Sequence, residues 1–428
     1  MAEPKIRFKE FEGLSCWENK RIEEICEILT GFPFEGQTIV NIGRNLLMRG
    51  INITEGVIRH SEEIDRYFDG DTSSLTKYRL KINDLVIGMD GSKVGKNSAL
   101  VTKKEENALL VQRVVRLRTK NATLSYLILV SVGSDKFFSY VDGMKTSSAI
   151  PHISLTDIKN FTINIPQQRE EQNALANYFR LLDNLIQSSE KKIASLRQVK
   201  AASLVSMFPQ AGETKPRVRF KGFQENWKTV PFDIVFRYLK NNTLSRADLN
   251  ETLGSARNIH YGDILIKFGT LLDIRKDDLP YITNHFLANQ LTNNCKLQKG
   301  DIIFADAAED STVGKCTEIA FIGEEKVVAG LHTIPCRTLF EFSEGYLGFY
   351  LNSPSYHNQL LSLMQGTKIS SISKSALLNT SISFPSNIAE QRQIASFFRS
   401  LDTQIFLETQ RLDKLKQIKS ACLDKMFV

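Results

Sequence analysis

The sequence predicts an α+β protein built from two copies of one unit. The first observation is that residues 166–208 and 385–427 resemble each other at a constant offset of 219 residues. The second is that apolar residues in both segments follow one another in steps of four and three, as in coiled-coil helices. The third is that short apolar runs, broken by Gly, Asn and Asp, precede both segments and indicate strands and turns. We therefore expect two α/β domains separated by two long helices, which form an antiparallel coiled coil in a pseudo-two-fold tandem repeat.

Length and composition are those of an ordinary globular protein. The chain has 428 residues, of which 42% are hydrophobic and 24% are charged, and this length is enough for two or three domains. No apolar run approaches the ~20 residues of a membrane-spanning helix, and the N-terminus carries no apolar signal-peptide core. We expect a cytoplasmic protein that has no contact with membranes.

Charge and cysteine usage exclude several classes of site. The net charge of +7 is compatible with nucleic-acid binding but does not require it. Six dispersed cysteines with no Cys-x-x-Cys pair argue against both a disulfide framework and a zinc site. We therefore expect reduced thiols and no bound metal.

The repeat extends beyond the two similar segments. Residues 5–11 and 217–223 carry the same Arg-Phe-Lys motif, and each motif is followed by a tryptophan, Trp17 or Trp227. Within the two similar segments identical residues recur at Pro166/Pro385, Glu171/Glu390, Gln172/Gln391, Phe179/Phe398, Arg180/Arg399, Leu182/Leu401, Asp183/Asp402 and Met207/Met426. We predict four parts: a first domain at 1–165, a first helix at 166–209, a second domain at 210–384 and a second helix at 385–428.

Each similar segment is predicted to be one helix of about 40 residues, or ~60 Å. The apolar stripes are Leu175, Phe179, Leu182, Ile186, Ile193 and Leu196 in the first copy, and Ile394, Phe398, Leu401, Ile405, Leu412 and Leu415 in the second. Both are interrupted at the same rung, by Ser189 and Glu408, where a polar group can fix register. A narrow stripe favours pairing of the two helices, and the alternative is that each helix packs on its own domain.

The domains are expected to contain strands at 84–88, 110–117, 161–165 and 301–305. Ser154-Leu-Thr-Asp157 has the pattern of a capping box that opens a short helix.

No catalytic set of residues is recognisable. Gly91-Ser-Lys-Val-Gly95-Lys96-Asn97 looks like a phosphate-binding loop, but Asp90 stands where the first glycine belongs and Asn97 replaces the magnesium-binding Ser or Thr. The related loop around Lys315 departs from the motif in the same way. The sequence therefore indicates a binding and scaffolding protein that is not an enzyme.

The chain resembles the specificity subunit of a type I DNA restriction–modification system over essentially all 428 residues. The resemblance rests on the Pro-x-x-x-x-Glu-Gln openings at 166–172 and 385–391, on the helices that follow them, and on Thr30-Gly-Phe-Pro-Phe-Glu-Gly36 and Leu331-His-Thr-Ile-Pro335. It implies two target-recognition domains, each of which reads one half of a bipartite, asymmetric site in double-stranded DNA. The helices would set the spacing of the half-sites and dock two adenine-methyltransferase subunits.

The resemblance also implies that this chain binds no cofactor. S-adenosylmethionine, ATP and magnesium would belong to the two modification subunits and two restriction subunits. An assembly scaffold without base readout is the alternative within this class, and a self-sufficient enzyme is the alternative from another class.

Candidate DNA contacts are basic and amide side chains, because Arg and Lys bind guanine and phosphates while Asn and Gln bind adenine. They are Arg44, Asn45, Arg49, Lys93, Lys96 and Lys145 in the first domain, and Lys267, Arg275, Lys276, Asn293, Asn294, Lys315 and Lys368 in the second. The alternative for each is an ordinary solvated surface residue.

Candidate docking residues for the partner subunits lie on the helices and are identical in both copies. They are Gln172, Arg180, Asp183, Gln391, Arg399 and Asp402, which we expect to be exposed because they lie off the apolar stripe. The alternatives are contacts between the helices, or an inherited surface without a role.

Overall fold

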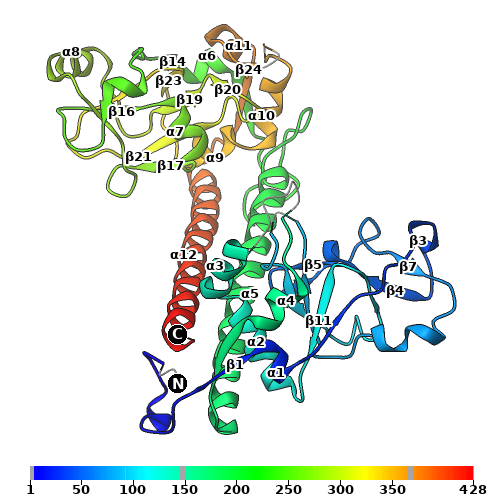
Figure 1. The fold of residues 1–428 in the computed structure, drawn as a ribbon. Helices are drawn as coiled ribbons and strands as arrows, with labels where there is room; N and C mark the ends of the chain where they lie inside the picture. The colour runs from blue at the N-terminus through cyan, green and yellow to red at the C-terminus, as the bar shows by residue number, and fades with distance from the viewer. Residues whose placement is uncertain (1–3, 92, 145–150, 365, 367–369, 428) are drawn as a thin grey trace. The chain divides into compact units, whose positions relative to one another are not determined.

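The computed structural model describes residues 4–91, 93–144, 151–364, 366 and 370–427 (Figure 1). Packing divides the chain into two compact units, Met1–Glu190 with Gln410–Val428, and Lys191–Thr409. Each unit thus contains one domain and parts of both long helices. The domain boundaries drawn from the repeat stay a prediction. Among the helices of the described ranges, none is both long enough and apolar enough to cross a bilayer.

The domain of the first unit is built on two four-stranded sheets, with strand orders β2-β11-β8-β9 and β10-β4-β7-β3. Its strands are β1 (Glu18–Arg21), β2 (Glu27–Thr30), β3 (Ile39–Val40), β4 (Asn45–Met48), β5 (Ile53–Thr54), β6 (Val57–Ile58), β7 (Tyr67–Phe68), β8 (Leu85–Gly88), β9 (Ser98–Leu100), β10 (Leu109–Leu110), β11 (Val114–Arg118) and β12 (Thr162–Ile165). Its short helices are α1 (Ile22–Ile25), α2 (Ala122–Val132), α3 (Asp135–Met144) and α4 (Leu155–Asn160).

The domain of the second unit has a five-stranded sheet, β14-β23-β19-β21-β17, and a four-stranded sheet, β15-β18-β16-β22. Its strands are β13 (Lys228–Pro231), β14 (Phe236–Tyr238), β15 (Leu249–Asn250), β16 (Arg257–Ile259), β17 (Leu271–Asp273), β18 (Tyr281–Ile282), β19 (Ile302–Ala305), β20 (Ala307–Ala308), β21 (Cys316–Phe321), β22 (Val327–Ala329), β23 (Thr333–Thr338), β24 (Ser370–Ser371) and β25 (Ser381–Phe384). Its short helices are α6 (Phe232–Val235), α7 (Tyr261–Ile266), α8 (His285–Cys295), α9 (Tyr346–Leu351), α10 (Pro354–Leu361) and α11 (Lys374–Leu378).

The two domains share a topology although their sequences diverge. The order β2-β11-β8-β9 returns as β14-β23-β19-β21, and the antiparallel pair β1–β12 returns as β13–β25. The parallel pair β4–β10 corresponds to β16–β22. The predicted tandem repeat is therefore confirmed at the level of strand order.

The local predictions are confirmed with one difference. β8, β12 and β19 lie in the predicted runs, and Ser154 and Asp157 form the predicted capping box at the start of α4. The run 110–117 is not one strand, because Arg113 adopts φ 65° between β10 and β11. A side chain rarely takes this left-handed conformation inside a strand, so the chain turns there.

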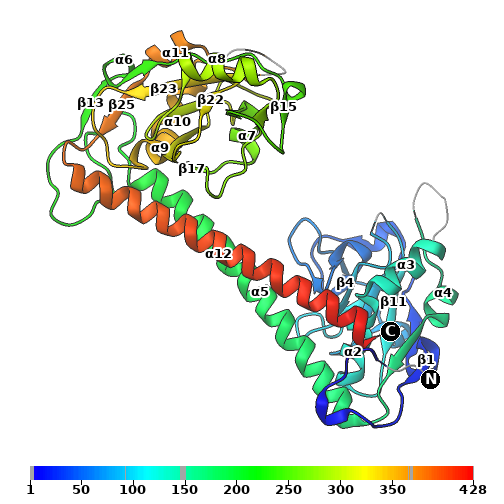
Figure 2. The same ribbon diagram turned by 90° about the vertical axis from the view of Figure 1, so that its left-hand side faces the viewer.

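The two long helices are α5 (Arg169–Ser206) and α12 (Ile388–Met426), and they pack antiparallel in each unit (Figure 2). In the first unit Lys416 pairs with Glu190 and Lys419 with Asp183, so residue numbers fall along α12 as they rise along α5. The buried residues of the predicted stripes are Leu175, Phe179, Leu182, Ile193, Ile394, Phe398 and Leu401. Except for Ile193, they lie in core clusters that combine residues of the domain with residues from the end of the other long helix or directly after it. The predicted antiparallel coiled coil is confirmed.

Candidate functional site

A buried carboxylate ties the start of α5 to the N-terminal segment in the first unit. Glu171 accepts hydrogen bonds from Arg7 Nε and Nη2, both at 2.7 Å, and from Trp17 Nε1 at 3.0 Å. The Glu171 side chain is 1% exposed. A bidentate arginine pair of this kind is the strong form of a charged hydrogen bond. The N-terminal segment is thereby fixed against the base of α5.

The second unit repeats this junction at the start of α12. Glu390 accepts hydrogen bonds from Arg219 Nε at 2.6 Å, from Arg219 Nη2 at 2.8 Å and from Trp227 Nε1 at 3.3 Å. The hydrogen bond to Glu390 raises the pKa of Arg219, despite its partial burial. We call these two sets, Arg7–Trp17–Glu171 and Arg219–Trp227–Glu390, the helix-base junctions. They explain why the Arg-Phe-Lys motif, the tryptophan and the helix opening are duplicated together.

The residues directly after each long helix contribute to the core around the start of the other long helix. In the first unit Phe427 lies 5.7 Å from the ring centres of Trp17 and Phe179. In the second unit Phe208 stacks on Phe398 at 5.8 Å and lies 6.2 Å from Trp227. Each unit therefore depends on side chains from both repeats.

Backbone contacts close the same helix ends. In the first unit Lys5 N donates to the carbonyl of Lys425 at 2.8 Å, and in the second unit Val218 N donates to the carbonyl of Ser206 at 2.9 Å. The last carbonyls of a helix have no partner inside the helix, so these bonds act as caps. The segments that carry the Arg-Phe-Lys motif thus fix the starts and the ends of the two helices.

Two of the predicted docking residues form equivalent bridges between the helices. Asp183 pairs with Lys419 at 2.6 Å in the first unit, and Asp402 pairs with Lys200 at 2.5 Å in the second. Asp183 also accepts from the Tyr126 hydroxyl at 2.6 Å, and burial together with this bond raises the pKa of Tyr126. Both aspartates therefore make contacts between the helices, which was the alternative to a docking role. Their role in docking stays a prediction.

The arginines and glutamines of the docking set contact their own domains. The Arg180 guanidinium lies 4.6 Å from the ring centre of Tyr126, and Arg399 pairs with Glu344 at 3.1 Å. Gln172 and Gln391 donate to the carbonyls of Pro166 and Pro385 at 2.8 and 2.9 Å, respectively.

The expected exposure is wrong for Gln391, which is 1% exposed because it also accepts from Ser343 N at 2.9 Å. A side chain enclosed in this way holds its own domain together and offers no surface to a partner.

The polar residues that interrupt both apolar stripes are buried. Ser189 and Glu408 are 2% and 6% exposed. In the second unit Lys192 Nζ donates to Glu408 Oε2 at 2.8 Å, so that the buried charge has a cationic partner. The Lys192 side chain is 56% exposed, so the pair lies at the edge of the helix seam, where it favours the one register in which both partners meet.

The candidate DNA contacts of the first domain that precede the β5–β6 hairpin mostly form hydrogen bonds or ion pairs with nearby residues. Arg44 is 80% exposed and pairs with Asp69 at 2.8 Å. Asn45 donates to the Phe68 carbonyl at 3.0 Å, and Arg49 donates to the Ile64 carbonyl at 2.6 Å. Burial lowers the pKa of Arg49. Arg44 is therefore better placed for DNA than Asn45 or Arg49.

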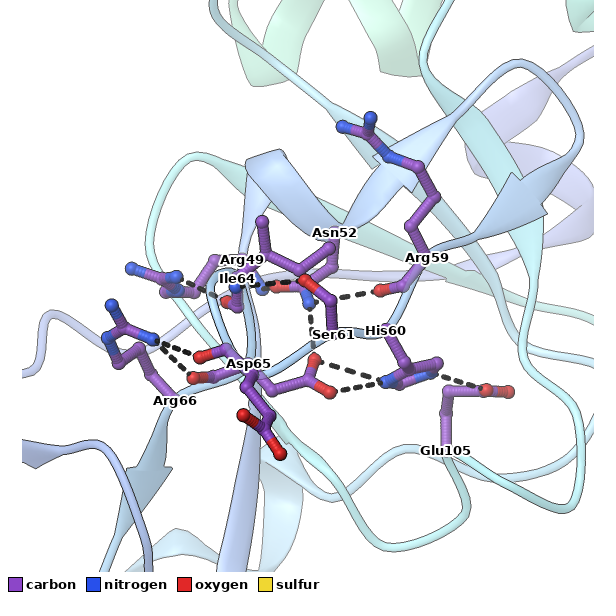
Figure 3. A network of polar contacts seen from close by, with 10 residues as sticks. Arg49, Asn52, Arg59, His60, Ser61, Ile64, Asp65, Arg66 and Glu105 are labelled. Atoms are coloured by element: carbon purple, nitrogen blue, oxygen red, sulfur yellow. Dashed lines mark hydrogen bonds and ion pairs between the residues drawn. The ribbon is translucent and has the colours of Figure 1, made fainter. Parts of the chain in front are cut away.

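A polar network fixes the loop 49–66, which includes the β5–β6 hairpin (Figure 3). The His60 ring lies between two carboxylates, with Nδ1 3.1 Å from Asp65 Oδ1 and Nε2 2.9 Å from Glu105 Oε1. Asn52 joins this network by donating to Asp65 Oδ1 at 3.0 Å. The loop is held rigidly and presents Arg59, an exposed residue that our sequence analysis missed.

A surface hollow of about 630 Å³ separates this hairpin from the loop at 90–97. Lys93 lines the hollow and pairs with Glu55 at 3.0 Å, while both side chains stay exposed. Lys96 is exposed and its ammonium lies 4.9 Å from the ring centre of Phe138. Arg59 lines the same hollow, so two cationic side chains, Arg59 and Lys93, border it. The prediction for Lys145 falls outside the described residues.

The second-domain candidates around β17 are tied to neighbouring acidic residues or carbonyls. Arg275 forms a bidentate pair with Asp273 and lies 3.8 Å from the ring centre of Phe321. Lys276 is 79% exposed with Asp273 at 4.0 Å, and Lys267 donates to the Asp278 carbonyl. Of these, Lys276 is the most available to another molecule.

The remaining candidate DNA contacts of the second domain differ in how accessible they are to DNA. Lys315 donates to the carbonyls of Leu265 and Phe268 at the end of α7, and burial lowers the pKa of Lys315. It therefore acts as a helix cap and is poorly placed to reach DNA. Asn293 and Asn294 are exposed on α8, whereas Lys368 falls outside the described residues. Within the described residues no group of three or more His, Cys, Asp and Glu side chains is arranged to hold a metal ion.

Comparison with known proteins identifies the family. The family model described as "Type I restriction modification DNA specificity domain" matches residues 15–198 and 225–417. The type I restriction enzyme EcoAI specificity subunit of Escherichia coli is 27% identical over 199 residues, which are 46% of this chain but only 33% of that protein. The MjaVIII specificity subunit of Methanocaldococcus jannaschii is 23% identical over 391 residues, or 85% of this chain and 86% of that protein.

A solved structure shows the same fold over the full chain. The S subunit of a type I restriction–modification system from M. genitalium aligns with a TM-score of 0.61 at 15% identity, covering 100% of this chain and 99% of that one. The family model matches both repeats, and the fold has the duplicated domain-and-helix order expected from the sequence. The chain therefore belongs to the family of type I restriction modification DNA specificity domains, of which it carries two copies.

Proposed function

We propose that this chain is the DNA-recognition subunit of a type I restriction–modification complex, in which each domain reads one half of a bipartite, asymmetric site. The observation that carries the proposal is the contrast between the two repeats. The helix-base junctions and the strand order are shared, whereas the loops and surface helices of the domains differ. Two domains that read different half-sites need different binding surfaces, and here two different surfaces are built on the same scaffold.

The paired helices would set the distance between the half-sites. A site in two halves needs readers held at a fixed separation and angular phase around the duplex, and an antiparallel helical pair is stiff enough to do this. Charged bridges at equivalent positions, Asp183–Lys419 and Lys200–Asp402, lock the pairing in each unit.

The helices would also dock two copies of an adenine methyltransferase. Val199 and Ile418 occupy equivalent positions in the repeat, and both are exposed apolar side chains on the long helices. Equivalent surfaces suit two identical partners, because a partner that fits one repeat also fits the other. In this proposal S-adenosylmethionine, ATP and magnesium are bound by two modification and two restriction subunits.

The proposal predicts that one methylated bipartite motif depends on this chain. Cells that contain the methyltransferase with and without this chain are compared by methylome sequencing. A motif with two defined halves and an unread gap should appear only when the chain is present. If the purified complex assembles but methylates no defined sequence, the chain is an assembly scaffold. If the chain alone methylates or cleaves DNA, it is an enzyme and the proposal is wrong.

A further inference from the structure

The outward face of α8 is rich in amides and carries no charge. Residues 285–295 contain no Asp, Glu, Lys or Arg. The exposed residues of the helix are His285, Phe286, Asn289, Gln290, Asn293 and Asn294. Phe286 is 81% exposed, which is unusual for a large aromatic side chain. Water-facing helices of soluble proteins normally carry charged residues, so this composition indicates a surface with a specific role.

The helix is held firmly enough to present this face. Asn284 caps its start by accepting from Leu287 N at 3.1 Å. Its inner side packs Ala288, which is fully buried, against Ile282 of β18 and Val328 of β22. Figure 1 shows α8 at the outer edge of its domain. The outward amides therefore stand on a rigid surface element.

The first domain does not repeat this feature. α8 lies between β18 and β19, and the corresponding stretch of the first domain lies between β7 and β8. That stretch, all of which is described, contains a short 3-10 helix, Ser73–Tyr78, with lysine in its last turn. α8 is thus a property of one half of the molecule, as expected of an element that reads one half-site.

We propose that α8 is the recognition helix of the second domain and reads A·T base pairs in the major groove. Asn and Gln side chains form bidentate hydrogen bonds with the N6 and N7 edge of adenine, and an aromatic side chain can contact the thymine methyl group. Asn289 and Gln290 lie three and four residues after Phe286, and Asn293 lies four and three residues after them, so the four residues form one stripe along the helix. The major groove of B-DNA is wide enough to admit one α-helix, so such a stripe can face the base edges.

Cations flank this stripe where the phosphates would lie. Lys296 directly follows α8 and is exposed, and Lys326 Nζ lies 3.5 Å from Asn289 Oδ1. Phosphate contacts fix the position of a recognition helix, while base contacts give it specificity. The proposal deepens the proposed function, on which it rests, by naming the element and the base pairs that it reads.

The test compares the double variant Asn289→Ala/Asn293→Ala with the unsubstituted chain, each in complex with the methyltransferase. Alanine favours a helix more than asparagine does, so α8 should be retained. The probe is a duplex that carries the methylated motif, alongside duplexes with single A·T to G·C changes in each half. We expect the variant to bind the motif about 10-fold or more weakly and to lose its preference at A·T pairs in one half only.

Two further variants separate base readout from other roles. Lys296→Ala/Lys326→Ala should weaken binding to all sequences and reduce its salt dependence, because these cations would contact phosphates. Gln224→Ala, which removes an exposed amide outside α8, should change neither affinity nor preference.

An unchanged base preference in the α8 double variant would overturn the proposal. Failure of that variant to bind the methyltransferase would overturn it as well, because α8 would then be a protein-docking surface. If the unsubstituted complex itself shows no sequence preference, the proposed function fails first.

Discussion

Replacing Glu390 with alanine should destabilise the second unit by about 3–5 kcal/mol, because removing one partner leaves a buried charge uncompensated. Glu390 is 1% exposed and receives both arms of the Arg219 guanidinium. The Trp227 indole N–H loses its acceptor as well, which adds the cost of a buried donor without a partner. The corresponding change Glu171→Ala should destabilise the first unit in the same way, since Arg7 and Trp17 make the equivalent contacts.

Urea denaturation with probes in each unit measures both effects. Glu390→Ala should shift the transition of the second unit and Glu171→Ala that of the first. The matched control is Glu213→Ala, because Glu213 pairs with an arginine that is 63% exposed, and pairs of this kind contribute about 1 kcal/mol or less. If Glu390→Ala destabilises the protein no more than Glu213→Ala does, the junction does not hold the base of α12.

Phe208→Ala should destabilise the second unit by about 3–5 kcal/mol, although Phe208 belongs to the first repeat, in which it follows α5 directly. The ring is fully buried and contacts Trp227, Tyr346, Tyr350 and Phe398. Removing it leaves a cavity where the end of α5 meets the start of α12. The equivalent change Phe427→Ala should act on the first unit, where Phe427 contacts Trp17 and Phe179.

Hydrogen exchange resolves where each change acts. Phe208→Ala should speed amide exchange at the end of α5 and the start of α12, and leave the first unit unchanged. Val205→Ala, in the last turn of α5 and three residues before Phe208, removes a side chain that is 39% exposed and should have little effect. Faster exchange in the first unit after Phe208→Ala would contradict the assignment of the helix ends.

The sequence predicted the long helices well because their evidence is local. The four-and-three spacing of Leu175, Phe179 and Leu182 is visible in one short segment, and its recurrence around Phe398 identifies a repeat. The helix-base junctions could not be predicted, because Arg7 and Glu171 are 164 residues apart and only folding brings them together. The only hint in the sequence was that the Arg-Phe-Lys motif and the helix opening are duplicated together. This indicates that both belong to the repeated unit, but it does not show that they are in contact.

The candidate DNA contacts were harder to predict because charge does not reveal orientation. Lys96 and Lys315 occupy equivalent loops, yet Lys96 is exposed and Lys315 caps α7. Asn293 and Asn294 were predicted as possible base contacts from their residue type. The helix that aligns Asn289 with Asn293 was not predicted, since α8 has Asn and Thr in its interior, which are weak helix formers.

The most direct test of the account is to lengthen both long helices and determine the methylated motif. One heptad inserted after Glu190 and one after Thr409 preserves the apolar stripe and leaves the pairing within each unit unchanged. Seven residues add ~10 Å of helix, which corresponds to about three base pairs at 3.4 Å each. We predict the same two half-sites with a gap longer by up to about three base pairs, and an unchanged gap would contradict the claim that the paired helices set the spacing.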